Sequence, residues 1–226
     1  MDILAYYFLF YVGLFLPFAA FRSAKRVREN RNIPSRKKAY LSTLFSLSIL
    51  LFITVFTARR NWITLFPTPV IGVRNVLIGL AALGLKLGYF FLRRRNRSFA
   101  THPSQKLMAP RTAEEKALFV IIVALAAVTE EAAYRGVAFQ LFWWLTGSAW
   151  IGAAASALAF GLSHQVQGWK VVIIVFFHAL LDQLVVYLTG SLYIVIAVHF
   201  IYDLIAGFLI SARIETVSNE PVAASG

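Results

Sequence analysis

Long apolar runs, separated by short polar connections, recur along this chain and limit its fold more than any other feature. A helix needs about 20 residues to cross the roughly 30 Å hydrocarbon core of a bilayer. In lipid, only α-helices and closed β-barrels satisfy all of their backbone hydrogen bonds. The runs are continuous and do not alternate between apolar and polar residues, which favours helices. The sequence therefore predicts an all-α fold, a polytopic transmembrane helical bundle.

About seven spans are predicted, within a range of six to eight. They are Ile3–Ala20, Ala39–Thr57, Val76–Leu92, Ala117–Phe142, Trp150–Ser163, Val171–Leu188 and Leu192–Ala212. The first run follows Met1 and Asp2 without a basic stretch, which is typical of a retained anchor and not of a cleaved signal peptide. We predict a multi-pass integral protein of the cell membrane, with the lipid bilayer as its surroundings.

The formal net charge of +12 lies mostly in two connections, 21–38 and 93–116. Basic loops beside membrane spans mark the cytoplasmic side and meet anionic head groups. We therefore predict no nucleic-acid partner, and an N-terminus outside with a C-terminus inside. The chain has no cysteine, which excludes disulfides, thiolate ligands and thiol catalysis.

Ionisable residues divide the chain into unequal parts. The first three predicted spans carry one charged residue, Lys86. The last four spans and their ends carry Glu130, Glu131, Arg135, His164, His178, Asp182, His199 and Asp203. Charges at bilayer depth are costly and usually pair, face a cavity or take part in chemistry. We predict an N-terminal membrane region of about three spans with basic loops at 1–115, a core at 116–212 that holds the function and a short polar, disordered tail at 213–226.

Two adjacent glutamates form the first candidate motif. Glu131 and Arg135 are four residues apart in the favourable acid-before-base order, which predicts an ion pair along one helical face. Glu130 is rotated by about 100° around the helix axis. It therefore projects elsewhere and is a candidate general base. The alternative is that both glutamates form structural ion pairs within the bundle.

Histidines supply the other candidates. His164 ends the fifth predicted span, and His199 and Asp203 share a helical face at a spacing of four. Such a pair can hold water, orient a tautomer, ligate a metal or donate to an oxyanion. His178 and Asp182 have the same spacing, so spacing alone does not decide between the two pairs.

Ser163, next to His164, suggests a serine nucleophile. However, the Gly-x-Ser-Gly form of rhomboid-type intramembrane proteases is absent, because His164 stands where its second glycine would be. We predict that this hydroxyl packs or bonds to its own helix.

Together these elements resemble the CPBP family, which includes CAAX prenyl endopeptidases and bacteriocin-processing or Abi-type membrane proteins. The family pattern is Glu-Glu-x-x-x-Arg, Phe-x-x-x-His and His-x-x-x-Asn or Asp, each on a separate transmembrane helix. The matching residues are Glu130, Glu131, Arg135, Phe160, His164, His199 and Asp203. A turn at 189–192 just before the last helix selects His199 over His178. The resemblance covers about residues 117–207 and implies a CAAX-protease-like core, with the first three spans as variable accessories.

The resemblance also implies a function, an intramembrane endopeptidase that acts on a membrane-associated or C-terminally processed peptide or protein. Glu130 would activate water with help from His164, and His199 and Asp203 would polarise the scissile carbonyl. Glu131 and Arg135 would support them. Many members have Asn where this chain has Asp203, and ionised Asp cannot donate to an oxyanion. Asp203 is therefore protonated, or orients His199, or marks an altered site.

A metal is not expected, because His-Glu-x-x-His is absent and the resemblance favours a glutamic peptidase. If zinc were bound, Glu130, His164 and His199 would be its ligands, with water in the fourth position. Two other functions compete with the peptidase. One is a catalytically silent Abi-type scaffold or immunity protein. The other is a proton-coupled transporter, which the absence of an internal repeat disfavours.

Overall fold

The computed structural model describes residues 1–29, 33–67, 71–95 and 102–219, and within these ranges it contains helices and no β-strand. The order is α1 (Ile3–Phe10), η1 (Tyr11–Phe15), α2 (Leu16–Arg28), α3 (Arg36–Arg60), α4 (Val73–Arg95), α5 (Pro103–Met108), α6 (Ala113–Glu130), η2 (Glu131–Ala138), α7 (Phe139–Thr146), α8 (Ala149–Ser163), η3 (Gln165–Gln167), α9 (Trp169–Thr189) and α10 (Leu192–Asn219). The elements η1 and η2 are π-helical. They join their neighbours into the continuous helices Ile3–Arg28 and Ala113–Thr146.

Six helices in the described ranges are long and apolar enough to cross a membrane. The predicted all-α bundle is therefore confirmed, and the protein is a multi-pass membrane protein. The predicted fifth span is the helix α8, which has only 15 residues and falls short of a full crossing. Its small residues let it lie close to α7: a Cβ on Gly152 would lie 2.9 Å from the backbone nitrogen of Trp143.

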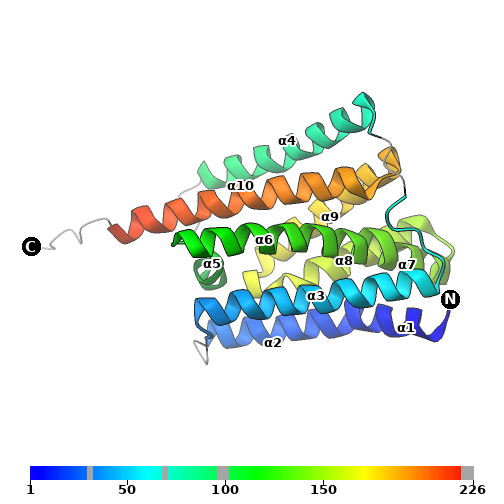
Figure 1. Ribbon diagram of the computed structural model, residues 1–226, viewed down its shortest axis with the longest axis horizontal. Helices are drawn as coiled ribbons and strands as arrows, with labels where there is room; N and C mark the ends of the chain where they lie inside the picture. The colour runs from blue at the N-terminus through cyan, green and yellow to red at the C-terminus, as the bar shows by residue number, and fades with distance from the viewer. Residues whose placement is uncertain (30–32, 68–70, 96–101, 220–226) are drawn as a thin grey trace, which may run out of the picture.

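The helices run roughly along one axis, with the start of α1 and the end of α10 at opposite ends of the bundle (Figure 1). In the same view α10 lies between α4 and α6, and it contacts both. The last helix continues to Asn219, so the prediction of a disordered tail from position 213 was wrong for residues 213–219. Residues 220–226 lie outside the described ranges, as do the basic residues Arg31 and Arg97.

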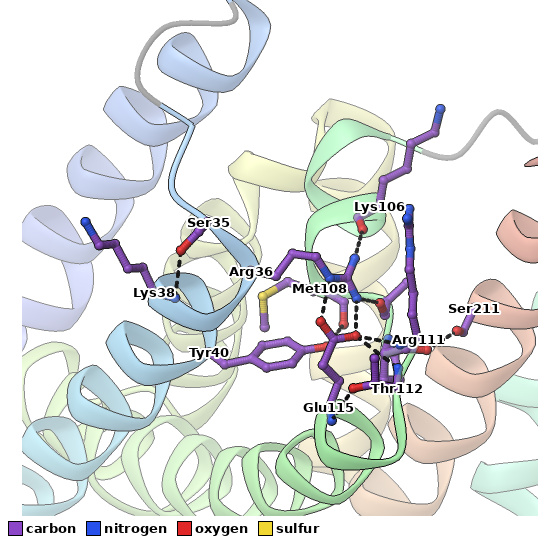
Figure 2. A network of polar contacts seen from close by, with 12 residues as sticks. Ser35, Arg36, Lys38, Tyr40, Lys106, Met108, Arg111, Thr112, Glu115 and Ser211 are labelled. Carbon is purple, nitrogen blue, oxygen red and sulfur yellow. Dashed lines mark hydrogen bonds and ion pairs between the residues drawn. The ribbon is translucent and has the colours of Figure 1, made fainter.

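A network of polar contacts joins α3, α5 and α6 at the end of the bundle that carries the basic connections (Figure 2). The Arg36 guanidinium donates through Nε and Nη2 to the two carboxylate oxygens of Glu115, each at 2.8 Å. It also donates to the carbonyls of Lys106, at 2.9 Å, and Ala109. The hydroxyl of Tyr40 donates to the carbonyl of Met108 at 3.0 Å. Through these bonds from Arg36 and Tyr40, α3 holds the short helix α5 and its C-terminal end in place.

Candidate active site

A cavity of about 360 Å³ lies among α4, α6, α9 and α10, and the polar side chains at its inner end include the predicted site. Glu130, His164, His199 and Asp203 all line it, so three separate helical segments contribute to one space. Apolar residues of α6 and α10 form much of its wall, among them Phe119.

Towards the basic end, the cavity is lined by Ser104, Gln105 and Met108 of α5 and by Gln167 of the α8–α9 connection. His102 caps α5, with its ring nitrogen Nδ1 accepting from the backbone N–H of Ser104. Burial lowers the pKa of His102 below its usual value, which favours the neutral ring that can accept this bond. We call α5 and the connection 165–168 the cavity mouth.

The two glutamates separate as predicted. Glu131 is fully buried, and its Oε2 lies 3.2 Å from Nε of Arg135. Glu130 stays outside this ion pair, faces the cavity and has its Oε2 3.8 Å from Nε2 of His199. The sequence reasoning assumed a regular α-helix here, whereas Glu131–Ala138 is π-helical. Such segments are rare and frequently occur at functional sites.

His199 connects the first motif to the third. Its Nδ1 lies 2.7 Å from Oε1 of Glu131, so the ring donates to that carboxylate. Its Nε2 lies 3.2 Å from Oδ2 of Asp203, one turn further along α10. Both nitrogens can donate at once only when the ring is protonated. With Glu131 at Nδ1 and Asp203 at Nε2, carboxylates on both edges fix the orientation of the ring.

Phe160 explains why the second motif begins with an aromatic residue. The guanidinium of Arg135 lies 4.4 Å from the centroid of its ring, within the range of a cation–π contact. The ring of His164 stands edge-on at 4.5 Å, and His199 lies 6.4 Å away. His164 itself sits at the end of α8, where its Nδ1 donates to the carbonyl of Phe160 at 2.9 Å. Phe160 thus contacts one basic side chain from each of the three motifs.

Residues 112–205 match the family model described as Type II CAAX prenyl endopeptidase Rce1-like, and the stretch contains every motif residue named above. Residues 112–205 are therefore similar to the Rce1-like family. The match covers less than half of the 226 residues, and neither the curated proteins nor the solved structures gave a match to the chain. The family is one of CAAX-type intramembrane proteases, as the sequence resemblance indicated.

Two charged residues beside the Rce1-like core motifs were not predicted as part of the site. Lys86 of α4 lies 2.6 Å from Oδ1 of Asp182 on α9, and both side chains are 3% exposed. Asp182 also accepts a hydrogen bond from Nη2 of Arg135 at 3.1 Å. Lys86 was the one charge in the first three spans, which is itself a signal of a buried partner. The sequence could not identify that partner, because it lies on another helix.

The remaining candidates are held by contacts other than those of the proposed reactive groups, although His178 and Asp182 line the same cavity. His178 stands edge-on to Tyr89 and Tyr202, while Asp182 binds Lys86 and Arg135. This arrangement agrees with the choice of His199 over His178. Ser163 donates to the carbonyl of Ala159 at 2.9 Å, as predicted for a hydroxyl in a membrane helix, and its Oγ also lies 3.2 Å from the hydroxyl of Tyr134.

No group of three or more His, Asp or Glu side chains in the described part of the chain is arranged to hold a metal ion. The suggested zinc ligands Glu130, His164 and His199 line the same cavity, but His199 is already engaged by carboxylates at both ring nitrogens. A metal-independent reaction stays a prediction.

Proposed function

We propose that this protein is an intramembrane endopeptidase in which Glu130 activates water for attack on a peptide bond. The observation that carries the proposal is that Glu130, His164, His199 and Asp203 line one cavity, while Glu131 takes the ion pair with Arg135. A free carboxylate, two imidazoles and room for water and a peptide are what such hydrolysis requires.

His164 and Glu130 together can hold the attacking water. Because Nδ1 of His164 donates to a backbone carbonyl, Nε2 of the neutral ring is an acceptor. A water molecule that donates one hydrogen to Nε2 and the other to the Glu130 carboxylate presents its oxygen lone pairs to the substrate. Glu130 then takes the proton as the C–O bond forms, and gives it to the leaving amine as the C–N bond breaks. General base catalysis of this kind contributes about 10²- to 10⁴-fold.

His199 is the donor for the oxyanion in this mechanism. Glu131 holds Nδ1, which directs the opposite edge of the ring to the cavity. In the protonated ring, Nε2–H lies 3.2 Å from Asp203 and can be shared between that carboxylate and the carbonyl oxygen as negative charge develops there. The 3.2 Å contact from Nε2 to Asp203 supports the second of the three roles considered for Asp203, orientation of His199. The substrate would be a peptide or protein held at the cell membrane and bound among the apolar walls of the cavity.

The test is a cleavage assay with the purified full chain in liposomes, using peptides with free and with prenylated C-terminal segments. We expect cleavage by the wild type and a loss of at least about 100-fold in Glu130→Gln and His164→Ala. Ser163→Ala is the matched control. Its hydroxyl bonds to the carbonyl of Ala159 and contacts the hydroxyl of Tyr134, but Ser163 does not line the cavity, so turnover should remain.

Three results would contradict parts of the proposal. Retained cleavage in both Glu130→Gln and His164→Ala would refute the assignment of roles. Loss of cleavage with a chelator, reversed by zinc, would refute the metal-independent mechanism. Full biological function of Glu130→Gln in cells would favour the scaffold protein over the peptidase.

A further inference from the structure

We infer that Lys86, which lies outside the Rce1-like core, is a positioning residue for His199. It acts through a chain of buried ionic contacts that runs from α4 through α9 and the π-helical turn η2 to α10. The inference rests on the proposed function, because it concerns the orientation of the oxyanion donor.

The chain of contacts is continuous and alternates in charge. Lys86 Nζ lies 2.6 Å and 2.7 Å from the two oxygens of Asp182. Asp182 Oδ2 lies 3.1 Å from Nη2 of Arg135, whose Nε lies 3.2 Å from Oε2 of Glu131. Glu131 Oε1 then holds Nδ1 of His199 at 2.7 Å. No step exceeds 3.2 Å, so each side chain limits the position of the next.

Burial makes the chain sensitive to the loss of any one member. The side chains of Lys86 and Asp182 are each 3% exposed, that of Arg135 is 2% exposed and that of Glu131 is fully buried. Removing one partner of such a pair leaves an uncompensated charge where water does not screen it. The remaining charges then rearrange toward each other.

Lys86 controls how Arg135 is shared between two carboxylates. With Lys86 present, the charge of Asp182 is divided between Lys86 and Arg135. Without Lys86, Asp182 attracts Arg135 alone and draws it away from Glu131. Glu131 then loses the contact that fixes it, and His199 loses the fixed acceptor at Nδ1. Because Arg135 also stacks on Phe160, its movement disturbs the ring against which His164 packs.

The Arg36–Glu115 pair offers a matched control. It is also an ion pair between two helices distant in sequence, at 2.8 Å. Its other contacts lead to the carbonyls of Lys106 and Ala109 near α5 (Figure 2). The side chains of Arg36 and Glu115 are 23% and 21% exposed, so Arg36→Met reports the loss of a more exposed ion pair, whereas a loss of His199 orientation should follow only from Lys86.

The experiment compares Lys86→Met, Lys86→Arg, the double variant Lys86→Met/Asp182→Asn, and Arg36→Met in the full chain. We expect Lys86→Met to lower kcat by about 10- to 100-fold with little change in KM, the size expected when a reacting group is displaced by about 1 Å. Lys86→Arg should retain most of kcat, and the double variant should recover part of it because no unpaired carboxylate remains. Arg36→Met should leave kcat unchanged.

The second readout is ¹⁵N NMR of the histidine rings as a function of pH, with the His199 signals assigned by their loss in His199→Ala. Lys86→Met and the double variant should displace the His199 titration, and Arg36→Met should not. A wild-type kcat and His199 titration in Lys86→Met would overturn the inference. If Lys86→Met does not fold, a wild-type His199 titration in the double variant overturns it instead.

The two proposals fail in different ways. If the wild type cleaves no peptide, or if Glu130→Gln cleaves as well as the wild type, the proposed function fails, while the NMR titration still tests the link from Lys86 to His199. If the wild type cleaves and Lys86→Met has the same kcat and His199 titration, the positioning role fails and the peptidase stands.

Discussion

The Rce1-like core at 112–205 and the N-terminal region before it contribute differently to one site. The core carries every residue of the three motifs. The N-terminal region contributes Lys86, buried against Asp182, and α5, which lines the cavity mouth. The resemblance implied that the first three spans are variable accessories. Whether these spans vary within the family stays a prediction. We propose a division in which the core supplies the reactive groups and the N-terminal region fixes them and lines part of their cavity.

The largest expected effect separates two histidines within the core. His199→Ala should lower kcat by about 10³-fold, equivalent to about 4 kcal/mol of transition-state energy, because the oxyanion donor is lost. His178→Ala is the control, since His178 faces the same cavity but packs against tyrosine rings. Initial rates of cleavage of the peptide substrate would measure the effect of both substitutions. A comparable loss in His178→Ala would contradict the assignment of His199 as the oxyanion donor and of His178 as a packing residue.

The next effect concerns a direct contact between the two regions. A Cβ on Gly136 would collide with Cδ2 of Leu65, from the α3–α4 connection, and would lie 3.4 Å from Leu192. Gly136→Ala should therefore destabilise the fold by about 1–3 kcal/mol. Thermal unfolding in detergent would measure this loss.

Leu65→Ala provides the control for that contact. In the Leu65→Ala background the added methyl group has room, so Gly136→Ala should cost less than in the wild type. An equal loss of stability from Gly136→Ala in both backgrounds would show that Leu65 of the N-terminal region does not limit the space beside η2.

A smaller effect is expected where α3 holds the cavity mouth. Tyr40→Phe removes a hydroxyl that donates to the carbonyl of Met108 and should destabilise the fold by about 1 kcal/mol. Because Tyr40 does not line the cavity, kcat should not change. A fall in kcat without a fall in stability would show that α3 affects the reaction directly, contrary to the proposed division between the two regions.

The smallest effect is expected at Asp203, where many family members have Asn. In Asp203→Asn the amide oxygen can still accept from Nε2 of His199, and the amide nitrogen can donate to an oxyanion. We expect kcat/KM to change by less than about tenfold, or about 1.4 kcal/mol. A loss as large as that of His199→Ala would show that the negative charge of Asp203 is itself required.

Hydropathy and spacing predicted the bundle, the approximate positions of its helices and the ion pair between Glu131 and Arg135, because these depend on local sequence. They did not predict the partner of Lys86, the position of α5 at the cavity mouth or the contact of Leu65 with Gly136. Each of those depends on which helices lie side by side, and one sequence carries no direct record of that arrangement. The π-helical turn at 131–138 was also missed, because no local pattern distinguished it from an α-helix.

The short helix α8 has a consequence for the surrounding lipid. Its 15 residues span about 22 Å, compared with roughly 30 Å of hydrocarbon. In Figure 1 the turn after α8 ends short of the starts of α3 and α6. The polar turn after α8, which carries His164 and Gln167, lines the cavity and packs against α2, α5 and α9. Protein and cavity water can therefore satisfy its polar groups within the bundle. A helix too short to cross the membrane thus ends inside the protein, and the surrounding lipid does not have to thin to accommodate it.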